Sequence, residues 1–156
     1  MEYTQAVQEL EALGIMPTHL PSLGPMKRAL LRSGLGARAD PKRNIVIAGT
    51  NGKGTTAATL SRLLHSAGQT VGLYTSPHLV TTRERIRVNE QDVSEGDFIQ
   101  AYERLKSLIR AERLTHFEAL TLMAAWIFFR QKPTDWILWE VGLGGMFDAT
   151  NAIPHS

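Results

Sequence analysis

The pattern of apolar and polar positions is most regular in the middle of the first half of the chain. Residues 44–48 form a short apolar run rich in β-branched side chains, which predicts a buried parallel strand. A glycine-rich turn follows, then a helix expected over residues 55–67 and a second strand over residues 71–75. This order within about 30 residues predicts a βαβ unit with a right-handed crossover. The helix face expected to point inward consists of Leu60, Leu63 and Leu64.

Helices and strands continue to alternate after this unit. Charged and apolar residues alternate over residues 83–88, which favours a short edge strand or an ordered loop. Ser94 is a candidate N-cap for a helix that runs to about residue 112. Residues 117–131 are strongly apolar and predict a buried helix. A third buried strand is expected over residues 136–141.

Two short helices are expected before the first strand, over residues 4–13 and 26–33, with a loop over residues 17–25. The spacing of their apolar residues gives each helix one inward face. The chain therefore divides into a helical N-terminal segment, residues 1–43, and an α/β segment, residues 44–156.

Composition narrows the class of protein without deciding its function. The chain has 156 residues, of which 43% are hydrophobic and 21% charged, as in ordinary globular domains. It has no cysteine, which excludes disulfides and thiolate metal sites and agrees with a cytoplasmic location. We find neither a secretory signal nor an apolar run of the ~18 residues that a membrane span needs.

Basic residues are concentrated between positions 27 and 43, although the formal net charge is only +2. One interpretation is a solvated helix face and linker. Another is a surface that attracts an anionic ligand. Nucleic acid is not favoured, because no aromatic residues interleave with the basic ones. The basic residues are Lys27, Arg28, Arg32, Arg38, Lys42 and Arg43.

The turn after the first strand has the composition of a phosphate-binding loop. Gly49 and Gly52 permit positive φ and leave room for backbone N–H groups to surround an anion. The helix that follows adds the positive end of its dipole. Lys53 can reach the outer phosphates of ATP, and the hydroxyl of Thr55 or Thr56 can coordinate Mg²⁺. The expected ATP-binding residues are Gly49, Thr50, Asn51, Gly52, Lys53, Gly54, Thr55 and Thr56.

The spacing of this loop departs from the strict form of the motif. Two residues separate Gly49 and Gly52, and Gly54 stands between Lys53 and Thr55. The strand before the loop and the helix after it are nevertheless those that the motif requires. The fold class predicted is α/β, with an incomplete P-loop-type parallel sheet and flanking helices. Because such a sheet usually has more than three strands, we expect the first part of a larger domain.

The variant Gly49-Thr-Asn-Gly-Lys-Gly-Thr55 resembles the ATP loop of the Mur-ligase superfamily, and its extra glycine is similar to the folylpolyglutamate synthase/dihydrofolate synthase branch. Further stretches resemble the same family in the same order. They are Tyr74-Thr-Ser-Pro-His-Leu79 with Arg83-Glu-Arg-Ile86, His116-Phe-Glu-Ala-Leu-Thr121, and Glu140-Val-Gly-Leu-Gly-Gly-Met-Phe-Asp-Ala-Thr-Asn151. The resemblance implies that residues 44–156 are the first part of the central ATPase domain of a Mur ligase.

The activity that the resemblance implies is ATP-dependent addition of glutamate to a folate or dihydropteroate carboxylate. The carboxylate attacks the γ-phosphate to give an acyl phosphate, which the amino group of glutamate then displaces. The family also implies a small-molecule enzyme, monomeric at full length and without a nucleic-acid or membrane partner. Its later metal-binding histidine, modified lysine and C-terminal domain have no counterpart here. We therefore expect these 156 residues alone not to catalyse ligation.

The resemblance also implies roles for individual residues around the metal. Ser76, Glu140 and Thr55 correspond to Mg²⁺ ligands, and Lys53 and Glu140 are the expected catalytic residues. A carboxylate at the end of an apolar strand is costly to bury unless it is paired or bound to a metal. His78 is interpreted as structural rather than as a ligand contact.

The substrate side of the site is implied by a second group of residues. Phe117 corresponds to an aromatic residue that packs on the pterin ring, with helix core as its alternative role. Asp148 and Ala149 correspond to a segment that contacts the pterin, with a turn or cap as the alternative for Asp148. Arg83, like Arg85, is a candidate for an anionic substrate group, or belongs to a solvated charge cluster.

One position departs from the family pattern, because Met146 replaces the usual arginine after the paired glycines. This puts substrate preference in doubt more than ATP binding. Two other functions stay open at this point: a truncated nucleotide-binding module without ligase activity, and a Mur-type ligase for a cell-wall precursor. The stretches at residues 117–118 and 148–151 argue against the second.

Overall fold

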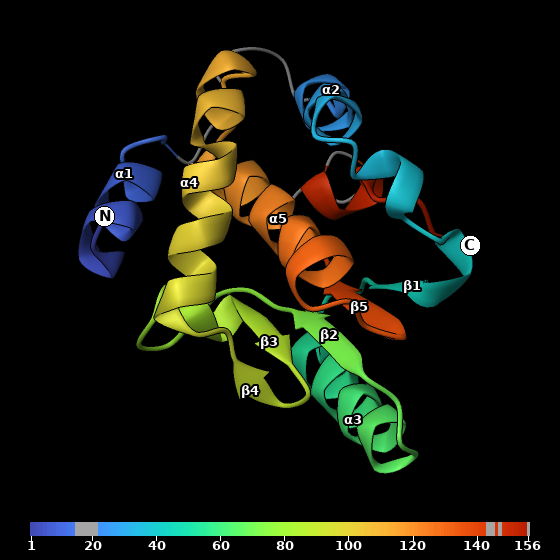
Figure 1. The fold of residues 1–156 in the computed structure, drawn as a ribbon. Helices are drawn as coiled ribbons and strands as arrows, with labels where there is room; N and C mark the ends of the chain where they lie inside the picture. The colour runs from blue at the N-terminus through green and yellow to red at the C-terminus, as the bar shows by residue number, and fades with distance from the viewer. Residues whose placement is uncertain (15–21, 143–145, 147, 156) are drawn as a thin grey trace.

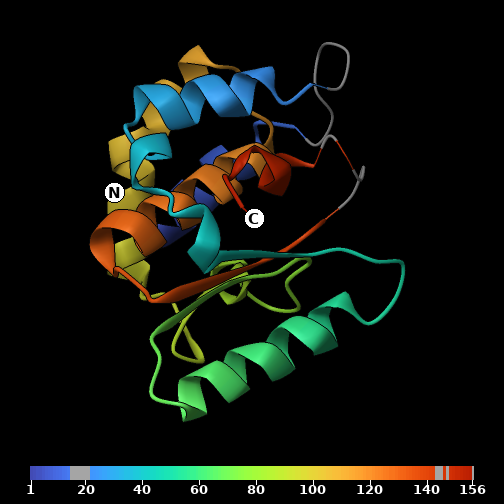
Figure 2. The same cartoon turned by 90° about the vertical axis from the view of Figure 1, so that its right-hand side faces the viewer.

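The computed structural model describes residues 1–14, 22–142, 146 and 148–155. In these residues a five-stranded sheet lies between helices (Figure 1, Figure 2). The strands are β1 (Asn44–Ile47), β2 (Val71–Tyr74), β3 (Ile86–Val88), β4 (Gln91–Asp92) and β5 (Trp136–Glu140). The α-helices are α1 (Tyr3–Glu11), α2 (Gly24–Arg32), α3 (Lys53–Ser66), α4 (Glu95–Ala111) and α5 (His116–Trp126). Short helical turns are η1 (Gly36–Arg38), η2 (Pro41–Arg43), η3 (Thr82–Arg85), η4 (Ile127–Gln131) and η6 (Ala149–Ala152).

The sheet has the strand order β1-β5-β2-β3-β4, with β5 inserted between the two strands of the predicted βαβ unit. The three strands β1, β5 and β2 are parallel, as predicted. Of the two alternatives for residues 83–88, the structure has the edge strand, and this strand β3 runs antiparallel to β2, with β4 antiparallel to β3. The connection from β2 to β3 contains only the turn η3, and a parallel return would need a longer crossover, usually a helix.

The two faces of the sheet bury different sets of side chains. Along β5, Leu138 packs toward α3, whereas Ile137 and Trp139 join the core under the other helices. This alternation is the period of two that a buried strand requires. Figure 2 shows α3 by itself on one side of the sheet and α1, α2, α4 and α5 on the other. The predicted strands are therefore buried on both faces.

The buried face of α3 differs from the prediction. Leu63 is 63% exposed, so its expected inward position was wrong. Ala57 and Ser61 are the buried residues of the helix, and Leu60 and Leu64 pack beside them. With 3.6 residues per turn, positions 57, 60, 61 and 64 fall within a stripe about 100° wide, and position 63 lies outside it.

The apolar segment predicted as one helix over residues 117–131 is two elements. It is α-helical to Trp126 and continues as the π-helical turn η4. Phe128 in η4 is buried against Gly72 of β2, and a Cβ placed on Gly72 would lie 2.7 Å from the ring atom Cδ1. The close approach of this helix end to the sheet therefore depends on a glycine in the strand.

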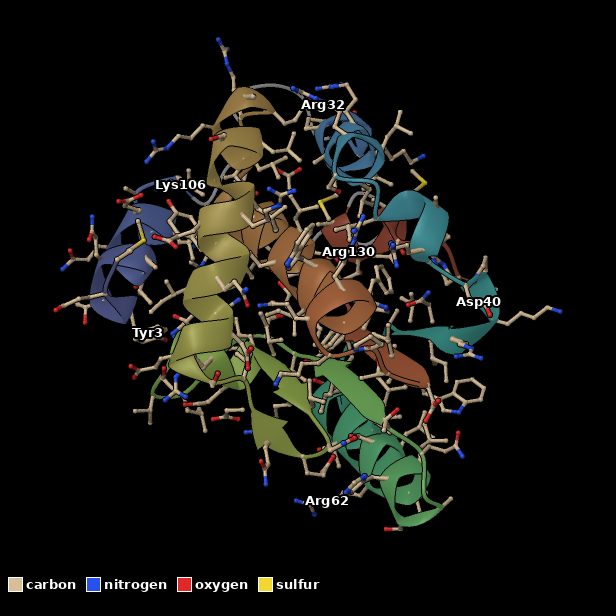
Figure 3. The ribbon with its side chains drawn as sticks, in the orientation of Figure 1. Tyr3, Arg32, Asp40, Arg62, Lys106 and Arg130 are labelled. Atoms are coloured by element: carbon tan, nitrogen blue, oxygen red, sulfur yellow. The ribbon has the colours of Figure 1, made fainter. Side chains whose placement is uncertain are left out.

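The N-terminal helices share the main core rather than standing apart from it. Ala6 and Leu10 of α1 and Met26 of α2 are completely buried in the same cluster as the residues of α4 and α5. Arg28 and Arg32 donate to Glu112 at the end of α4, at 2.7 and 2.6 Å (Figure 3 labels Arg32). Two of the clustered basic side chains thus hold α2 to α4, which leaves fewer of them for an anionic ligand. The boundary at residue 43 stays a prediction.

A single carboxylate organises the loop that follows β2. Glu84 accepts hydrogen bonds from the backbone N–H groups of Leu79, Val80 and Thr81 at 2.8–2.9 Å. These bonds, led by the one from Leu79, lower the pKa of Glu84 from 4.5 to about 2. The hydroxyl of Tyr3 lies 2.8 Å from that of Thr81 and ties the loop to α1.

Among the described residues, no helix is both long and apolar enough to cross a membrane.

The contact between Gly72 and Phe128 gives a first prediction. Gly72→Ala should lower the free energy of unfolding by about 1–3 kcal/mol, the usual cost of overpacking a buried contact. Phe128→Leu should reduce that loss, because it removes the ring atoms that the new methyl group meets. Urea unfolding of the two single variants and the double variant measures both effects. Gly36→Ala, with its nearest such neighbour at 3.9 Å, is the control, and an equal loss there would contradict the explanation.

The loop held by Glu84 gives a second prediction. A carboxylate with a lowered pKa in the folded state stabilises that state above its ordinary pKa, and the contribution is lost as the pH falls toward the lowered value. The amide resonances of Leu79, Val80 and Thr81 should therefore stay constant down to about pH 4.5 and titrate together as the pH approaches about 2. In Glu84→Gln they should not follow this titration. An inflection near pH 4.5 in the unmodified chain would show that the three bonds do not form.

Candidate active site

The loop between β1 and α3 has the backbone conformation of an anion-binding turn. Gly49 and Gly52 have φ of +150° and +78°, which is favourable only for glycine. Gly52 is the N-cap of α3, and no side chain caps the first turn of that helix. The helix begins at Lys53, two residues earlier than predicted, so Lys53 and Gly54 belong to its first turn. Uncapped N–H groups at a helix N-terminus are suited to phosphate.

The lysine of the loop folds back over it. Lys53 Nζ donates to the carbonyl oxygen of Gly49 at 2.8 Å, which holds its charge at the mouth of the loop. Thr55 and Thr56 follow in the first turn and are both exposed. Their hydroxyls are therefore accessible to a bound group, as the sequence required. The loop as a whole offers hydrogen-bond donors and one cationic side chain, that of Lys53.

Glu140 ends β5 directly beside this loop. Parallel pairing sets Glu140 opposite Ile47, the last residue of β1. The carboxylate is 5% exposed, and the Ser76 N–H donates to its Oε2 at 3.1 Å. A Cβ placed on Gly54 would lie 3.5 Å from Oε1, so the first turn of α3 passes close to the carboxylate. The structure thus brings together the predicted residues Gly54, Ser76 and Glu140.

This arrangement fits a divalent cation that is held partly by its substrate. Among the described residues, no cluster of three or more histidine, aspartate or glutamate side chains could hold a metal. Glu140 is buried, and among the described residues no cation pairs with it, although burying a lone carboxylate is costly. Mg²⁺ commonly takes one or two protein oxygens and completes its shell with phosphates and water. Glu140, the Ser76 hydroxyl and Thr55 supply oxygens of that kind.

A second group of predicted residues lies around Gly142, near Ser76. Phe117 is in the first turn of α5, and its ring centroid is 5.8 Å from that of Tyr74. The ring also lies against Gly142, because a Cβ placed there would be 2.7 Å from Cζ. The same Cβ would be 3.2 Å from Ser76 Oγ. Phe117 is only partly buried, so part of its surface stays accessible.

Asp148 and Ala149 are buried where the chain returns toward β5. Asp148 Oδ2 accepts from the Gly142 N–H at 2.8 Å, and Oδ1 accepts from the Thr150 N–H at 2.9 Å. Asp148 is therefore the N-cap of η6, the alternative that the sequence left open. Its carboxylate also fixes the distance between η6 and the end of β5.

Met146, the residue that replaces the family's usual arginine, is 73% exposed, and its neighbours 143–145 and 147 lie outside the described residues.

The two arginines singled out by the sequence point to different places. Arg83 donates to the Val93 carbonyl at 3.1 Å and stacks over the Tyr3 ring at 5.5 Å, so it is occupied by α1 and the hairpin. Arg85 instead donates from Nε to His78 Nδ1 at 2.8 Å. Partial burial and the positive charge of Arg85 lower the pKa of His78, which keeps this imidazole neutral near pH 7.

Three-dimensional contacts reveal one residue that the sequence did not single out. Gly142 touches Phe117, Ser76 and Asp148, three residues named for other reasons. The signal available in the sequence was its place two residues after Glu140 in a glycine-rich stretch. A glycine at such a place can equally mark an ordinary turn, so the sequence signal was not specific.

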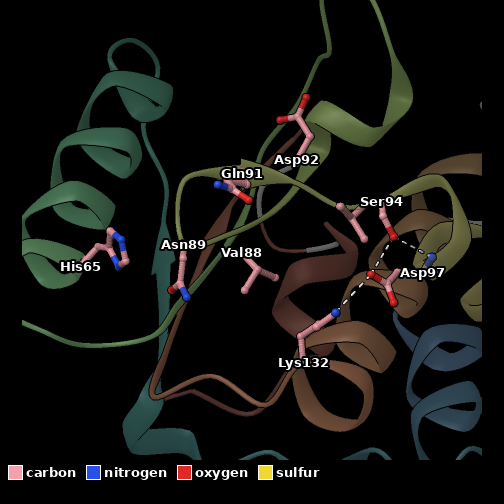
Figure 4. A pocket seen from close by; sticks show the side chains of 9 residues that line it. His65, Val88, Asn89, Gln91, Asp92, Ser94, Asp97 and Lys132 are labelled. Carbon is pink, nitrogen blue, oxygen red and sulfur yellow. Dashed lines mark hydrogen bonds and ion pairs between the residues drawn. The ribbon is translucent and has the colours of Figure 1, made fainter.

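A separate cavity of about 480 Å³ lies between the β3–β4 hairpin, α3 and η4 (Figure 4). None of the candidate residues lines it. Within it, Asp97 accepts a hydrogen bond from Ser94 and pairs with Lys132 at 3.4 Å. Its charged groups are therefore already used, and the candidate site is the edge of the sheet at the ends of β1, β2 and β5.

No family profile matches the chain. The curated dihydrofolate synthase/folylpolyglutamate synthase of Escherichia coli (strain K12) is 42% identical over 84% of this chain and 31% of its own length. The mitochondrial folylpolyglutamate synthase of Bos taurus is 38% identical over 98% of this chain and 29% of its own length. The chain thus spans about a third of the length of these relatives.

Solved structures agree with the sequence relatives. The bifunctional folylpolyglutamate synthase/dihydrofolate synthase of Yersinia pestis CO92 has a TM-score of 0.89 at 38% identity, over 99% of this chain and 37% of that one. A structure of such a bifunctional enzyme with Mn, AMPPNP and L-glutamate bound has a TM-score of 0.88 at 37% identity, over 99% and 36%. Over the length that it spans, the chain belongs to the folylpolyglutamate synthase/dihydrofolate synthase family of Mur-ligase folds and corresponds to the N-terminal part of its members.

Proposed function

We propose that the chain is the ATP-binding part of a ligase that joins glutamate to a folate or dihydropteroate carboxylate through an acyl phosphate. The observation that carries the proposal is the meeting of the loop of residues 49–56 with Ser76 and Glu140 at one edge of the sheet. The carboxyl ends of parallel strands are where folds of this class bind ligands. The relatives whose names state this activity match the chain over most of its length.

The nucleotide would lie on the loop between β1 and α3. Uncapped N–H groups of α3 and the positive end of its dipole favour phosphate oxygens there. Lys53, now bonded to the Gly49 carbonyl, would exchange that neutral partner for a phosphate, a stronger charge-assisted contact. The relative with bound AMPPNP supports ATP as the nucleotide.

The metal would be held by Glu140, Ser76 and Thr55 together with the nucleotide. When bound, a divalent cation neutralises charge on the phosphates that are transferred. The role of Glu140 is to supply a fixed negative charge in a dry position, because it is buried and oriented by the Ser76 N–H. The relative with bound Mn supports a divalent metal.

The substrate would lie on the Phe117 side of Ser76. Phe117 would offer the accessible part of its ring to a pterin, and Asp148, which is buried like Ala149, is bonded to Gly142 beside that ring. Of the two arginines, the contacts favour Arg85 over Arg83 for an anionic group, because Arg83 is bound to Val93 and Tyr3. Arg83 could bind the substrate only if it gave up its contacts with Val93 and Tyr3.

The reaction needs little covalent participation by the protein. The substrate carboxylate oxygen attacks the γ-phosphorus of ATP, and ADP leaves. The amino group of glutamate then attacks the acyl carbon, an amide forms, and phosphate leaves with one proton released. The residues act by positioning the two substrates and by stabilising charge.

We further propose that the full-length protein works as a cytoplasmic monomer on small molecules. Size-exclusion chromatography with light scattering of the native protein would test the monomeric state.

The assay that tests the proposed function uses the full-length gene product with ATP, Mg²⁺, glutamate and either dihydropteroate or tetrahydrofolate. We expect a product one glutamate heavier and one ADP and one phosphate per amide bond, with mass spectrometry as the readout. Nucleotide binding without any glutamate adduct would instead indicate the nucleotide-binding module. An adduct only with a cell-wall precursor would indicate the other type of ligase.

The roles of Lys53 and Glu140 give a third prediction. Lys53→Ala should weaken ATP binding and lower kcat, and Glu140→Gln should lower kcat and raise the Mg²⁺ concentration needed for half-maximal rate. Losses of about 10²–10³-fold in kcat are typical when one charge-stabilising group is removed. Lys42→Ala removes a cation outside the loop and is the control, with kcat expected within twofold of the unmodified enzyme. An unchanged Mg²⁺ dependence in Glu140→Gln would exclude its role at the metal.

A further inference from the structure

Gly142 lies between the two halves of the candidate site. It follows β5, and its φ is outside the positive range that marks five other glycines of the described residues. The absence of a side chain is therefore needed for space and not for backbone conformation. A Cβ on Gly142 would lie 2.7 and 2.8 Å from Phe117 Cζ and Cε2, closer than Cβ atoms come to other atoms in real structures.

The space that a Gly142 side chain would occupy also borders the metal half of the site. The Cβ would lie 3.2 Å from Ser76 Oγ, a tight contact to a hydroxyl expected to bind the cation. The Ser76 N–H holds Glu140, two residues before Gly142 in the chain. A displacement at Gly142 would therefore reach both proposed metal ligands, one by direct contact and one through the backbone.

The substrate half is connected through the backbone of the same residue. The Gly142 N–H donates to Asp148 Oδ2 at 2.8 Å, and Asp148 is 2% exposed. The Phe117 ring lies where a Gly142 side chain would be, and its centroid is 5.8 Å from that of Tyr74. A side chain on Gly142 would therefore press on the Phe117 ring and on the Ser76 hydroxyl at the same time.

From these contacts we infer that Gly142 is a positioning residue that sets the metal-binding and substrate-binding halves at one fixed separation. The inference rests on the proposed function for the identity of the two halves. Transfer of a phosphoryl group to the substrate carboxylate requires the two reactants in a narrow range of geometry. A residue without a side chain at their junction permits the necessary approach of ring and hydroxyl.

Gly142→Ala in the full-length protein tests the inference. We expect the half-saturating Mg²⁺ concentration and the KM for the accepted pterin substrate both to rise by about tenfold, since a shift of about 1 Å can cost up to 10²-fold. Phe117→Leu in the same chain removes the ring atoms that the methyl group meets. In the double variant the Mg²⁺ requirement should fall below that of Gly142→Ala but stay above the unmodified value, because the contact with Ser76 Oγ remains, while the KM stays high.

Matched variants separate this effect from a general loss of stability. Gly96→Ala also adds a methyl group to a described glycine, and its Cβ meets only Ser94 Oγ at 3.9 Å, so both constants should stay within twofold. Phe117→Leu alone should raise the KM and leave the Mg²⁺ requirement unchanged. If Gly142→Ala does not fold, Phe117→Trp crowds the same contact from the other side and should raise the Mg²⁺ requirement.

A measurement without turnover distinguishes failure of the inference from failure of the proposed function. Mn²⁺ binding in the presence of AMPPNP, followed by electron paramagnetic resonance, reports the metal half directly. If the unmodified protein makes no glutamate adduct, the proposed reaction is overturned. If Gly142→Ala nevertheless lowers the Mn²⁺ affinity, the inferred coupling is still supported. Unchanged Mn²⁺ affinity in Gly142→Ala, or no recovery in the double variant, would overturn the inference.

Discussion

Parallel pairing of β5 between β1 and β2 is the constraint on which the rest of the site depends. The register sets Glu140 opposite Ile47, and Tyr74 of β2 opposite Trp139. The loops that leave β1 and β2 therefore start on either side of one carboxylate. Glu140 lies next to the loop between β1 and α3 because of these backbone hydrogen bonds, although the two are far apart in the sequence.

The helices on both faces make that constraint rigid. On one face Ala57, Leu60 and Leu64 of α3 pack with Ile47 and Leu138, so the helix that carries Lys53 is fixed on the strands. On the other face α1, α2, α4 and α5 share a larger core, and Trp139 is completely buried in it. A carboxylate at the end of such a strand cannot turn away to solvent. Its charge stays available to a cation at the edge of the sheet.

Side chains pack closely against the backbone at glycines in this fold. Gly72 admits the Phe128 ring to the centre of the sheet, and Gly142 admits the Phe117 ring to its edge. Gly54 leaves a Cβ-sized space beside the Glu140 carboxylate. The first of these contacts affects stability, whereas the other two lie where the nucleotide, metal and substrate would meet. Helix caps such as Ser94 and Thr115 are local by comparison and only set where helices begin.

The sequence alone determined the local structure and the kinds of chemistry. The apolar runs predicted β1, β2 and β5, the glycines and Lys53 predicted a phosphate-binding loop, and four ordered motifs indicated the family, because each is contained within a few neighbouring residues. Tertiary structure decided the rest: the insertion of β5, the antiparallel edge, the exposure of Leu63, and the direction of Arg83 away from His78 and of Arg85 toward it. Strand order and side-chain direction depend on contacts between residues distant in the chain, and no local pattern specifies them.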